Sequence, residues 1–243
     1  PDLVHLIFDG EASIDITVSE PTNQIVMNAV DLEVQSATFS GVGVRDSAAE
    51  ICIDETHETL TLNFGQNIPI GEAQLVIKFT GELNDKMRGF YRGSYVTRKG
   101  EQRYLATTQF EPTDARRAFP CWDEPACKAK FQVNLVVPTD LVALSNTACI
   151  EEVRVNSGLK TICFAETPVM STYLLAFIVG DLTSIEESTA NGTKIAVWTT
   201  RGKEEQGRFA LDTCVRLLDF FNDYFGIPYP LQKLDHIAIP DFA

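Results

Sequence analysis

Polar and apolar residues alternate over most of the first four fifths of the chain. The alternation is regular over Ala12–Val18 and returns in four further stretches, Val30–Val34, Leu60–Phe64, Leu75–Phe79 and Phe131–Val137. A period of two places apolar side chains on one face of a strand, so each stretch predicts a half-buried β-strand. Gly65-Gln66-Asn67 predicts a turn directly after one of them. Many such strands at short spacing predict a mainly β, largely antiparallel domain.

Two later segments depart from this pattern. Tyr173–Val179 is continuously apolar, which predicts a strand buried on both faces. Beyond Asn191-Gly192, a short strand over Lys194–Thr199 precedes a convincing helix, Glu204–Phe225. Apolar residues of this helix recur at steps of three and four and form one stripe: Leu211, Val215, Leu218, Phe221 and Phe225. Glu204 and Glu205 are expected to complement the helix N-terminus, and Gly226 to end the helix.

Composition supports a globular chain and excludes some classes of function. Of its 243 residues, 44% are hydrophobic, which is enough for a core, and no segment has low complexity. The formal net charge is −14 and there is no basic stripe to neutralise phosphates, so we expect no nucleic-acid partner. No apolar run is long enough to predict a membrane segment. The acidity favours solubility, with attraction of a cationic ligand as the alternative.

Candidate metal ligands are sparse. The chain has three histidines, His5, His57 and His236. A zinc protease helix needs two histidines four residues apart with a glutamate directly after the first. His57-Glu58 begins such a string, but Thr61 stands where the second histidine belongs, so no metal site is predicted in this chain.

Candidate nucleophiles are equally sparse. No G-x-S-x-G motif is present. The six cysteines are spread along the chain without a C-x-x-C pair, and they predict free thiols in a reducing compartment. A disulfide between Cys149 and Cys163, which flank a predicted hairpin, is the alternative.

The segment Arg103–Phe131 mixes aromatic, acidic, basic and amide side chains with three prolines, which is typical of a structured loop at a site. Gln109 and Glu111 are two apart on an extended run, so their side chains point the same way and Phe110 points the other way. An amide oxygen and a carboxylate facing one space suit a ligand ammonium group. The alternative, that both satisfy backbone donors within the loop, fits the residues equally well.

The other charged residues of this segment predict a salt-bridged corner that fixes the loop: Asp114, Arg116, Arg117, Asp123 and Glu124. Two arginines among so many carboxylates more often hold a loop than bind a ligand. Phe119, Cys121 and Trp122 are predicted to form the hydrophobic plug of this corner.

At this segment the sequence resembles a known family. The string TTQFEPTDARRAFPCWDEPACKAKF, Thr107–Phe131, closely resembles the signature of the aminopeptidase N family, which includes the puromycin-sensitive aminopeptidases. Similar landmarks occur elsewhere: GFYRGSY at Gly89–Tyr95, ALSN at Ala143–Asn146 and FFNDYFGIPYPLQKLDHIAIPDFA at Phe220–Ala243. The resemblance extends over essentially the whole chain.

This resemblance implies how the chain is organised. Residues 1–194 would form an N-terminal β-saddle domain, and residues 195–243 a truncated beginning of a thermolysin-like catalytic domain. The family's next motif, G-A-M-E-N, would follow within a residue or two of Ala243, with H-E-x-x-H later. Zn²⁺ is thus implied for the complete protein, while no zinc ligand and no catalytic base is assigned to this chain, which we expect to be inactive alone.

The resemblance also implies two site residues. Gln109 would line the pocket for the first side chain of the substrate, and Glu111 would help hold its free α-amino group. The implied function is the substrate-anchoring portion of a zinc metalloaminopeptidase that acts on peptides with a free N-terminus, with the rest of the catalytic domain as partner. The alternative is a non-catalytic binding or scaffold module of the same family.

The compartment is predicted from weaker signals. The absence of a secretory signal and the free thiols favour a cytoplasmic protein. The glycosylation sequon Asn191-Gly192-Thr193 favours the opposite.

Overall fold

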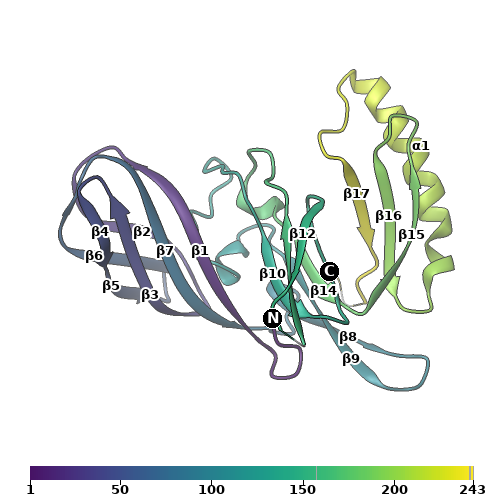
Figure 1. Cartoon of the computed structure of the whole chain (residues 1–243), viewed down its shortest axis with the longest axis horizontal. Helices are drawn as coiled ribbons and strands as arrows, with labels where there is room; N and C mark the ends of the chain where they lie inside the picture. The colour runs from purple at the N-terminus through teal and green to yellow at the C-terminus, as the bar shows by residue number, and fades with distance from the viewer. Residues whose placement is uncertain (157, 241, 243) are drawn as a thin grey trace. The chain divides into compact units, whose positions relative to one another are not determined.

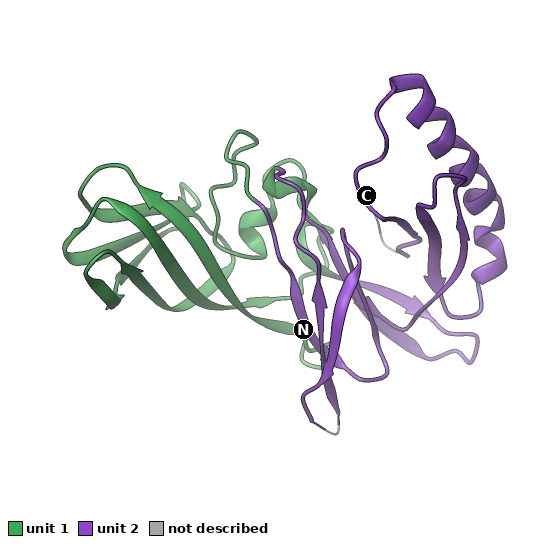
Figure 2. Ribbon diagram, turned by 45° about the horizontal axis from the view of Figure 1, so that its top comes forward, with its two compact units in different colours: residues 1–91, 109–129, 171–174 green, residues 92–108, 130–170, 175–243 purple. Residues whose placement is uncertain are grey.

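The computed structural model describes residues 1–243 except 157, 241 and 243, and shows a mainly β, largely antiparallel fold, as predicted (Figure 1). It divides into two compact units that interleave along the chain. Unit 1 contains residues 1–91, 109–129 and 171–174, and unit 2 contains residues 92–108, 130–170 and 175–243 (Figure 2). The predicted domain boundary between residues 194 and 195 stays a prediction.

Unit 1 is built on two antiparallel sheets whose apolar faces meet. One sheet has the order β1-β7-β3-β4 and the other the order β2-β6-β5. Phe39 of β3 and Phe64 of β6 meet edge to face with their ring centroids 5.7 Å apart, and Leu62 and Ile77 beside them are fully buried. The strands are β1 (Ile7–Val18), β2 (Thr22–Asn28), β3 (Leu32–Gly41), β4 (Val44–Ala48), β5 (Glu50–Asp54), β6 (Thr59–Ile68) and β7 (Gly71–Glu82).

Unit 2 contains three sheets. Their orders are β11-β14-β9-β8, β10-β13-β12 and β15-β16-β17. The sheet β11-β14-β9-β8 shares a core with the start of β15, and the buried residues of this core are Leu105, Leu144, Ile178 and Leu182. The strands are β8 (Gly89–Val96), β9 (Gln102–Gln109), β10 (Asn134–Pro138), β11 (Val142–Ser145), β12 (Cys149–Arg154), β13 (Leu159–Phe164), β14 (Phe177–Gly180), β15 (Leu182–Ser188), β16 (Lys194–Thr200) and β17 (Lys233–Ile237). The first three residues of β8, and Gln109 at the end of β9, belong to unit 1.

The helix α1 (Arg208–Phe225) lies against the last sheet (Figure 1). It connects β16 to β17, which run parallel. A parallel pair of strands needs a long crossover connection, and α1 forms it. Leu211 is fully buried against Ile195 and Val197 of β16, and Val215 and Leu218 pack beside it. Gly226 takes the left-handed conformation, φ 64°, and ends the helix as predicted.

The helix differs from its prediction at its start and in how much of its apolar stripe is buried. Residues Glu204–Gly207 form a 3₁₀ turn and the α-helix begins only at Arg208. Glu204 accepts a hydrogen bond at 2.9 Å from the backbone amide of Gly202, which lies before this turn. At the other end, Phe221 and Phe225 are 43% and 64% exposed, so only the first half of the predicted stripe is covered within the described residues.

Two other local predictions were wrong. Gly65-Gln66-Asn67 is not a turn, because β6 continues to Ile68. Tyr173–Val179 is not one strand: Thr172–Leu174 form a 3₁₀ turn and the strand begins at Phe177. The hydroxyl of Thr172 donates a hydrogen bond to Asp123 at 2.6 Å, and this buried polar contact holds the segment out of the sheet.

Gly10 in β1 is predicted to be required for close packing in unit 1. A Cβ atom at Gly10 would lie 2.3 Å from the ring of buried Phe79. We expect Gly10→Ala to destabilise the protein by about 1–3 kcal/mol through overpacking. The control is Gly65→Ala in β6, where no atom lies within 4 Å of the added carbon. Urea midpoints measure the difference, and equal midpoints for both variants would contradict the packing argument.

The exposed aromatic face of α1 predicts self-association of the 243-residue chain. Phe220, Phe221, Tyr224 and Phe225 are all exposed, and contiguous apolar surface of this kind drives association. We expect the sedimentation coefficient to rise with protein concentration. Replacing Phe220 and Tyr224 by serine should remove this dependence, whereas a serine at the isolated exposed Val42 should not.

Candidate functional site

Gln109 and Glu111 lie where the strand β9 gives way to a loop in unit 1. Gln109 is half-buried, Phe110 is buried and Glu111 is exposed, an alternation that agrees with Phe110 pointing away from the other two. The Gln109 side chain donates a weak hydrogen bond from Nε2 to the carbonyl oxygen of Glu111, at 3.4 Å. Within the described part of the chain, no hydrogen bond or ion pair is found for the Glu111 carboxylate.

The loop that follows is fixed by the buried pair Arg116–Asp123. The Nε atom of Arg116 lies 3.1 Å from Oδ2 of Asp123, and the backbone amide of Arg116 donates to the same oxygen at 3.2 Å. The other Asp123 oxygen accepts from Thr172, and the Asp123 amide donates to Asn28 Oδ1 at 3.1 Å. A buried carboxylate is tolerated only with such full compensation, so these donors define where the loop can lie.

Arg117 makes the second set of ion pairs. Its Nε atom lies 2.7 Å from Asp114 Oδ1, one Nη atom lies 3.0 Å from Glu58 Oε1, and the other contacts Asp31. Burial alone would lower the pKa of the Arg117 guanidinium, but the hydrogen bond to Asp114 and the charge of Asp31 outweigh it and raise the pKa. The predicted salt-bridged corner is therefore present for Asp114, Arg116, Arg117 and Asp123, whereas Glu124 is exposed and takes no part in these ion pairs.

The predicted plug is also present. Phe119 meets Phe110 edge to face with ring centroids 5.9 Å apart. Cys121 is buried and forms a β-bridge with Asn28, and burial raises the pKa of its thiol above the ordinary cysteine value. Trp122 donates a hydrogen bond from Nε1 to the carbonyl of Val26 at 2.8 Å. The plug thus attaches the loop to β2 through both backbone and side chains.

The partners of the loop that lie far away in the chain could not be predicted from local sequence patterns. Glu58 forms ion pairs with both arginines of the loop. In the sequence, Glu58 stands out only as the glutamate of an incomplete zinc motif. His57 beside it is exposed and its Nδ1 lies 2.8 Å from Asp54, in the turn between β5 and β6. Nothing in the local pattern marks Glu58 as a partner of arginines 58 and 59 positions away, or Asp31 as a partner of an arginine 86 positions away, because the pairing depends on the sandwich topology.

Among the described residues, metal-ligating side chains do not cluster. In residues 1–240 and 242, leaving out 157, no group of three His, Cys, Asp or Glu side chains could hold a metal ion. All six cysteines are free, including Cys149 and Cys163. The described residues therefore offer no site for the zinc that the sequence resemblance implies for the complete protein.

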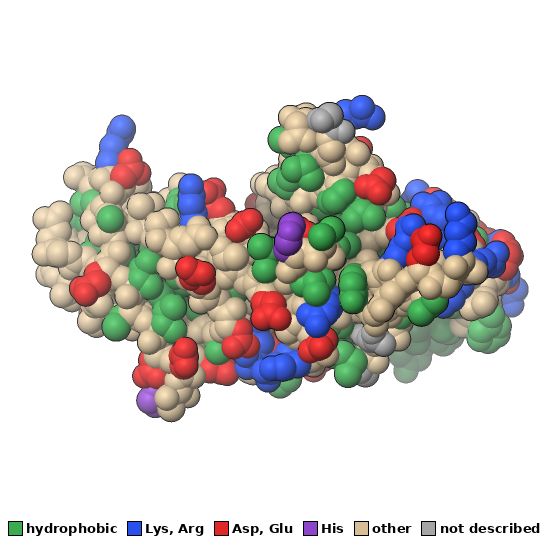
Figure 3. All heavy atoms as spheres, turned by 90° about the horizontal axis from the view of Figure 1, so that it is seen from below, with side chains coloured by type: hydrophobic (Ala, Val, Ile, Leu, Met, Phe, Trp, Pro, Cys, Tyr) green, Lys and Arg blue, Asp and Glu red, His purple; other side chains and the backbone are tan. Residues whose placement is uncertain are grey.

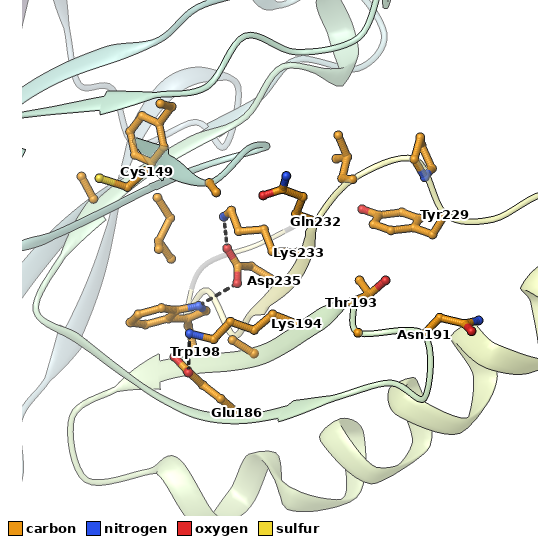
Figure 4. Close-up of a pocket in the computed structure, with 18 residues that line it drawn as sticks. Cys149, Glu186, Asn191, Thr193, Lys194, Trp198, Tyr229, Gln232, Lys233 and Asp235 are labelled. Carbon is orange, nitrogen blue, oxygen red and sulfur yellow. Dashed lines mark hydrogen bonds and ion pairs between the residues drawn. The ribbon is translucent and has the colours of Figure 1, made fainter. Parts of the chain in front are cut away.

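Unit 2 contains a cavity of about 770 Å³ (Figure 4). Its charged groups are paired with one another. Lys233 pairs with Asp235 and donates to the Ser145 carbonyl at 2.8 Å, Trp198 donates to Asp235 at 3.1 Å, and Lys194 pairs with Glu186 at 2.6 Å. Neither Gln109 nor Glu111 lines this cavity.

Charged side chains of both signs lie on the surface of the molecule. On the face shown in Figure 3, acidic side chains are spread widely, and basic side chains gather at one end with acidic ones among them. In unit 2, Arg103 and Arg201 both pair with Asp181. Over the described ranges, no helix combines the length and the apolar character that crossing a bilayer requires.

Comparison with known proteins places this loop in a family. The chain is 53% identical to Aminopeptidase M1-B of Oryza sativa subsp. japonica, 49% to Aminopeptidase M1 of Arabidopsis thaliana and 44% to Puromycin-sensitive aminopeptidase of Caenorhabditis elegans. Each match covers 100% of this chain but only 27%, 28% and 26% of the relative, so the chain spans about a quarter of their length. The model of the peptidase M1 N-terminal domain matches residues 1–174, and the chain belongs to this family.

Proposed function

We propose that this chain is the N-terminal, substrate-anchoring portion of a zinc metalloaminopeptidase that removes N-terminal residues from peptides. The relatives bear the name aminopeptidase, and the chain corresponds to their N-terminal domain. The observation that carries the anchoring role is the state of Glu111. Its carboxylate is exposed and has no partner among the described residues, whereas Asp114 and Asp123 on the same loop are held by arginines.

An unpaired carboxylate on a fixed loop suits the ammonium group at a peptide N-terminus. A hydrogen bond between charged groups contributes about 1.5–3 kcal/mol of binding free energy. It is also more specific when the carboxylate is held in place. Gln109, at the end of β9, would lie beside the first side chain of the peptide. A carboxylate that demands a free ammonium one residue from the scissile bond restricts cleavage to the first peptide bond.

The zinc belongs to the same proposal. Because the described residues form no metal site, we place the zinc and the catalytic base in parts of the longer protein outside this chain and derive no chemical step through them.

We also propose a cytoplasmic location, because the six cysteines, including exposed Cys52 and Cys127, are free thiols.

The anchoring role predicts the kinetics of Glu111→Ala in the full-length protein. The ammonium contact is present in the ground state and the transition state alike, so its loss should raise KM more than it lowers kcat. We expect KM for an aminoacyl anilide to rise about tenfold to a hundredfold. Glu124→Ala is the matched control, since Glu124 is an exposed carboxylate on the same loop that makes no ion pair there.

Two results would contradict the proposal. Unchanged KM and kcat for Glu111→Ala would remove the anchoring role. A reading frame that continues without G-A-M-E-N and H-E-x-x-H would favour the alternative, a non-catalytic binding or scaffold module, and the full-length protein would then show no aminopeptidase activity.

A further inference from the structure

Glu58 connects the loop to a different part of unit 1. It lies at the end of the turn between β5 and β6, and its two carboxylate oxygens are divided between adjacent arginines of the loop. Oε2 lies 3.1 Å from Arg116 Nη1, and Oε1 lies 3.0 Å from Arg117 Nη2. One carboxylate thus fixes two consecutive arginine side chains, whereas a single hydrogen bond could fix only one of them.

The backbone at Glu58 is held in an unfavourable conformation. Its φ is 54°, in the left-handed region that residues with a Cβ atom rarely occupy. Asp31, which also pairs with Arg117, has a φ of 57°. Backbone strain of this kind persists where surrounding contacts enforce it, and here both strained residues present a carboxylate to the same guanidinium.

A short series of contacts leads from Glu58 to the candidate site. Arg117 holds Asp114 through Nε at 2.7 Å. The backbone amide of Asp114 donates to the carbonyl oxygen of Phe110 at 2.8 Å. Phe110 stands between Gln109 and Glu111 in the chain. Because the Asp114 amide binds the Phe110 carbonyl, the position of Asp114 determines the direction in which the backbone leaves Gln109 and enters Glu111.

We infer that Glu58 is a positioning residue for Glu111, acting through Arg117 and Asp114 to set where the Glu111 carboxylate meets the ammonium group of a peptide. The inference rests on the proposed function of Glu111. It makes the turn between β5 and β6, more than 50 residues earlier in the chain, a determinant of substrate capture.

Glu58 can be tested because its removal does not leave an unpaired charge in the core. Its side chain is 31% exposed, whereas that of Asp123 is 1% exposed. In Glu58→Gln, Arg116 keeps Asp123, and Arg117 keeps Asp114 and Asp31. The loop therefore keeps its local fold and loses its attachment to the turn. The matched control is Glu55→Gln, which removes an exposed carboxylate from the same turn.

The experiment is a double-mutant cycle of Glu58→Gln and Glu111→Ala in the full-length protein, measured with an aminoacyl anilide as substrate. We expect Glu58→Gln to raise KM about fivefold, with kcat nearly unchanged, and to have no further effect in the Glu111→Ala background. The Ki of a competitive inhibitor that lacks the α-amino group should be unchanged, because that inhibitor does not use Glu111. A general distortion of the substrate site would raise this Ki as well.

Each other outcome overturns a defined statement. If Glu111→Ala raises KM but Glu58→Gln behaves like Glu55→Gln, the positioning role is wrong and the proposed function stands. If Glu58→Gln raises KM equally in both backgrounds, Glu58 does not act through Glu111. If Glu111→Ala leaves KM unchanged, the proposed function fails, and the positioning role fails with it.

Discussion

Compensation of one buried charge determines the shape of the loop at the candidate site. The Asp123 side chain is 1% exposed and is neutralised by Arg116, with further donors from the Arg116 amide and from Thr172. Removing one partner of such a pair typically costs about 3–5 kcal/mol, because the other charge stays buried without compensation. Few other backbone paths would bring all of these donors to one carboxylate. The exposed Glu111 is therefore carried by a loop that has little freedom to rearrange.

The sandwich of unit 1 supplies what the loop itself lacks. Asn28 is the last residue of β2, Asp31 lies in the connection between β2 and β3, and Glu58 lies in the turn between β5 and β6. Connections at the ends of strands carry polar side chains at no cost to the core, and the packed sheets fix their positions. The regular strands thus serve the site indirectly, by holding at one place the residues that pair with the loop.

Periodicity predicted what depends on local pattern, and failed where distant contacts decide. The strands around Ile14, Leu62 and Ile77 follow from alternation, and the end of α1 follows from Gly226. Thr172–Leu174 looks like the start of a strand, but the contact with Asp123 draws it into a 3₁₀ turn. The charged composition of the loop predicted a salt-bridged corner. That Glu58 pairs with both arginines of this corner could not be predicted, because only the pairing of β5 with β6 brings the turn that carries Glu58 to the loop.

The division of unit 1 among three separate stretches of chain has a consequence for its biosynthesis. Residues 1–91 and 109–129 leave the ribosome well before residues 171–174, which supply the Thr172 hydroxyl to Asp123 and the Ser171 hydroxyl to the Pro125 carbonyl. Until then, the nascent loop has one donor fewer for its buried carboxylate. The loop that bears Gln109 and Glu111 therefore reaches its final set of hydrogen bonds only after residues 92–108 and 130–170 of unit 2 have been synthesised. Its maturation is late although its own residues are early.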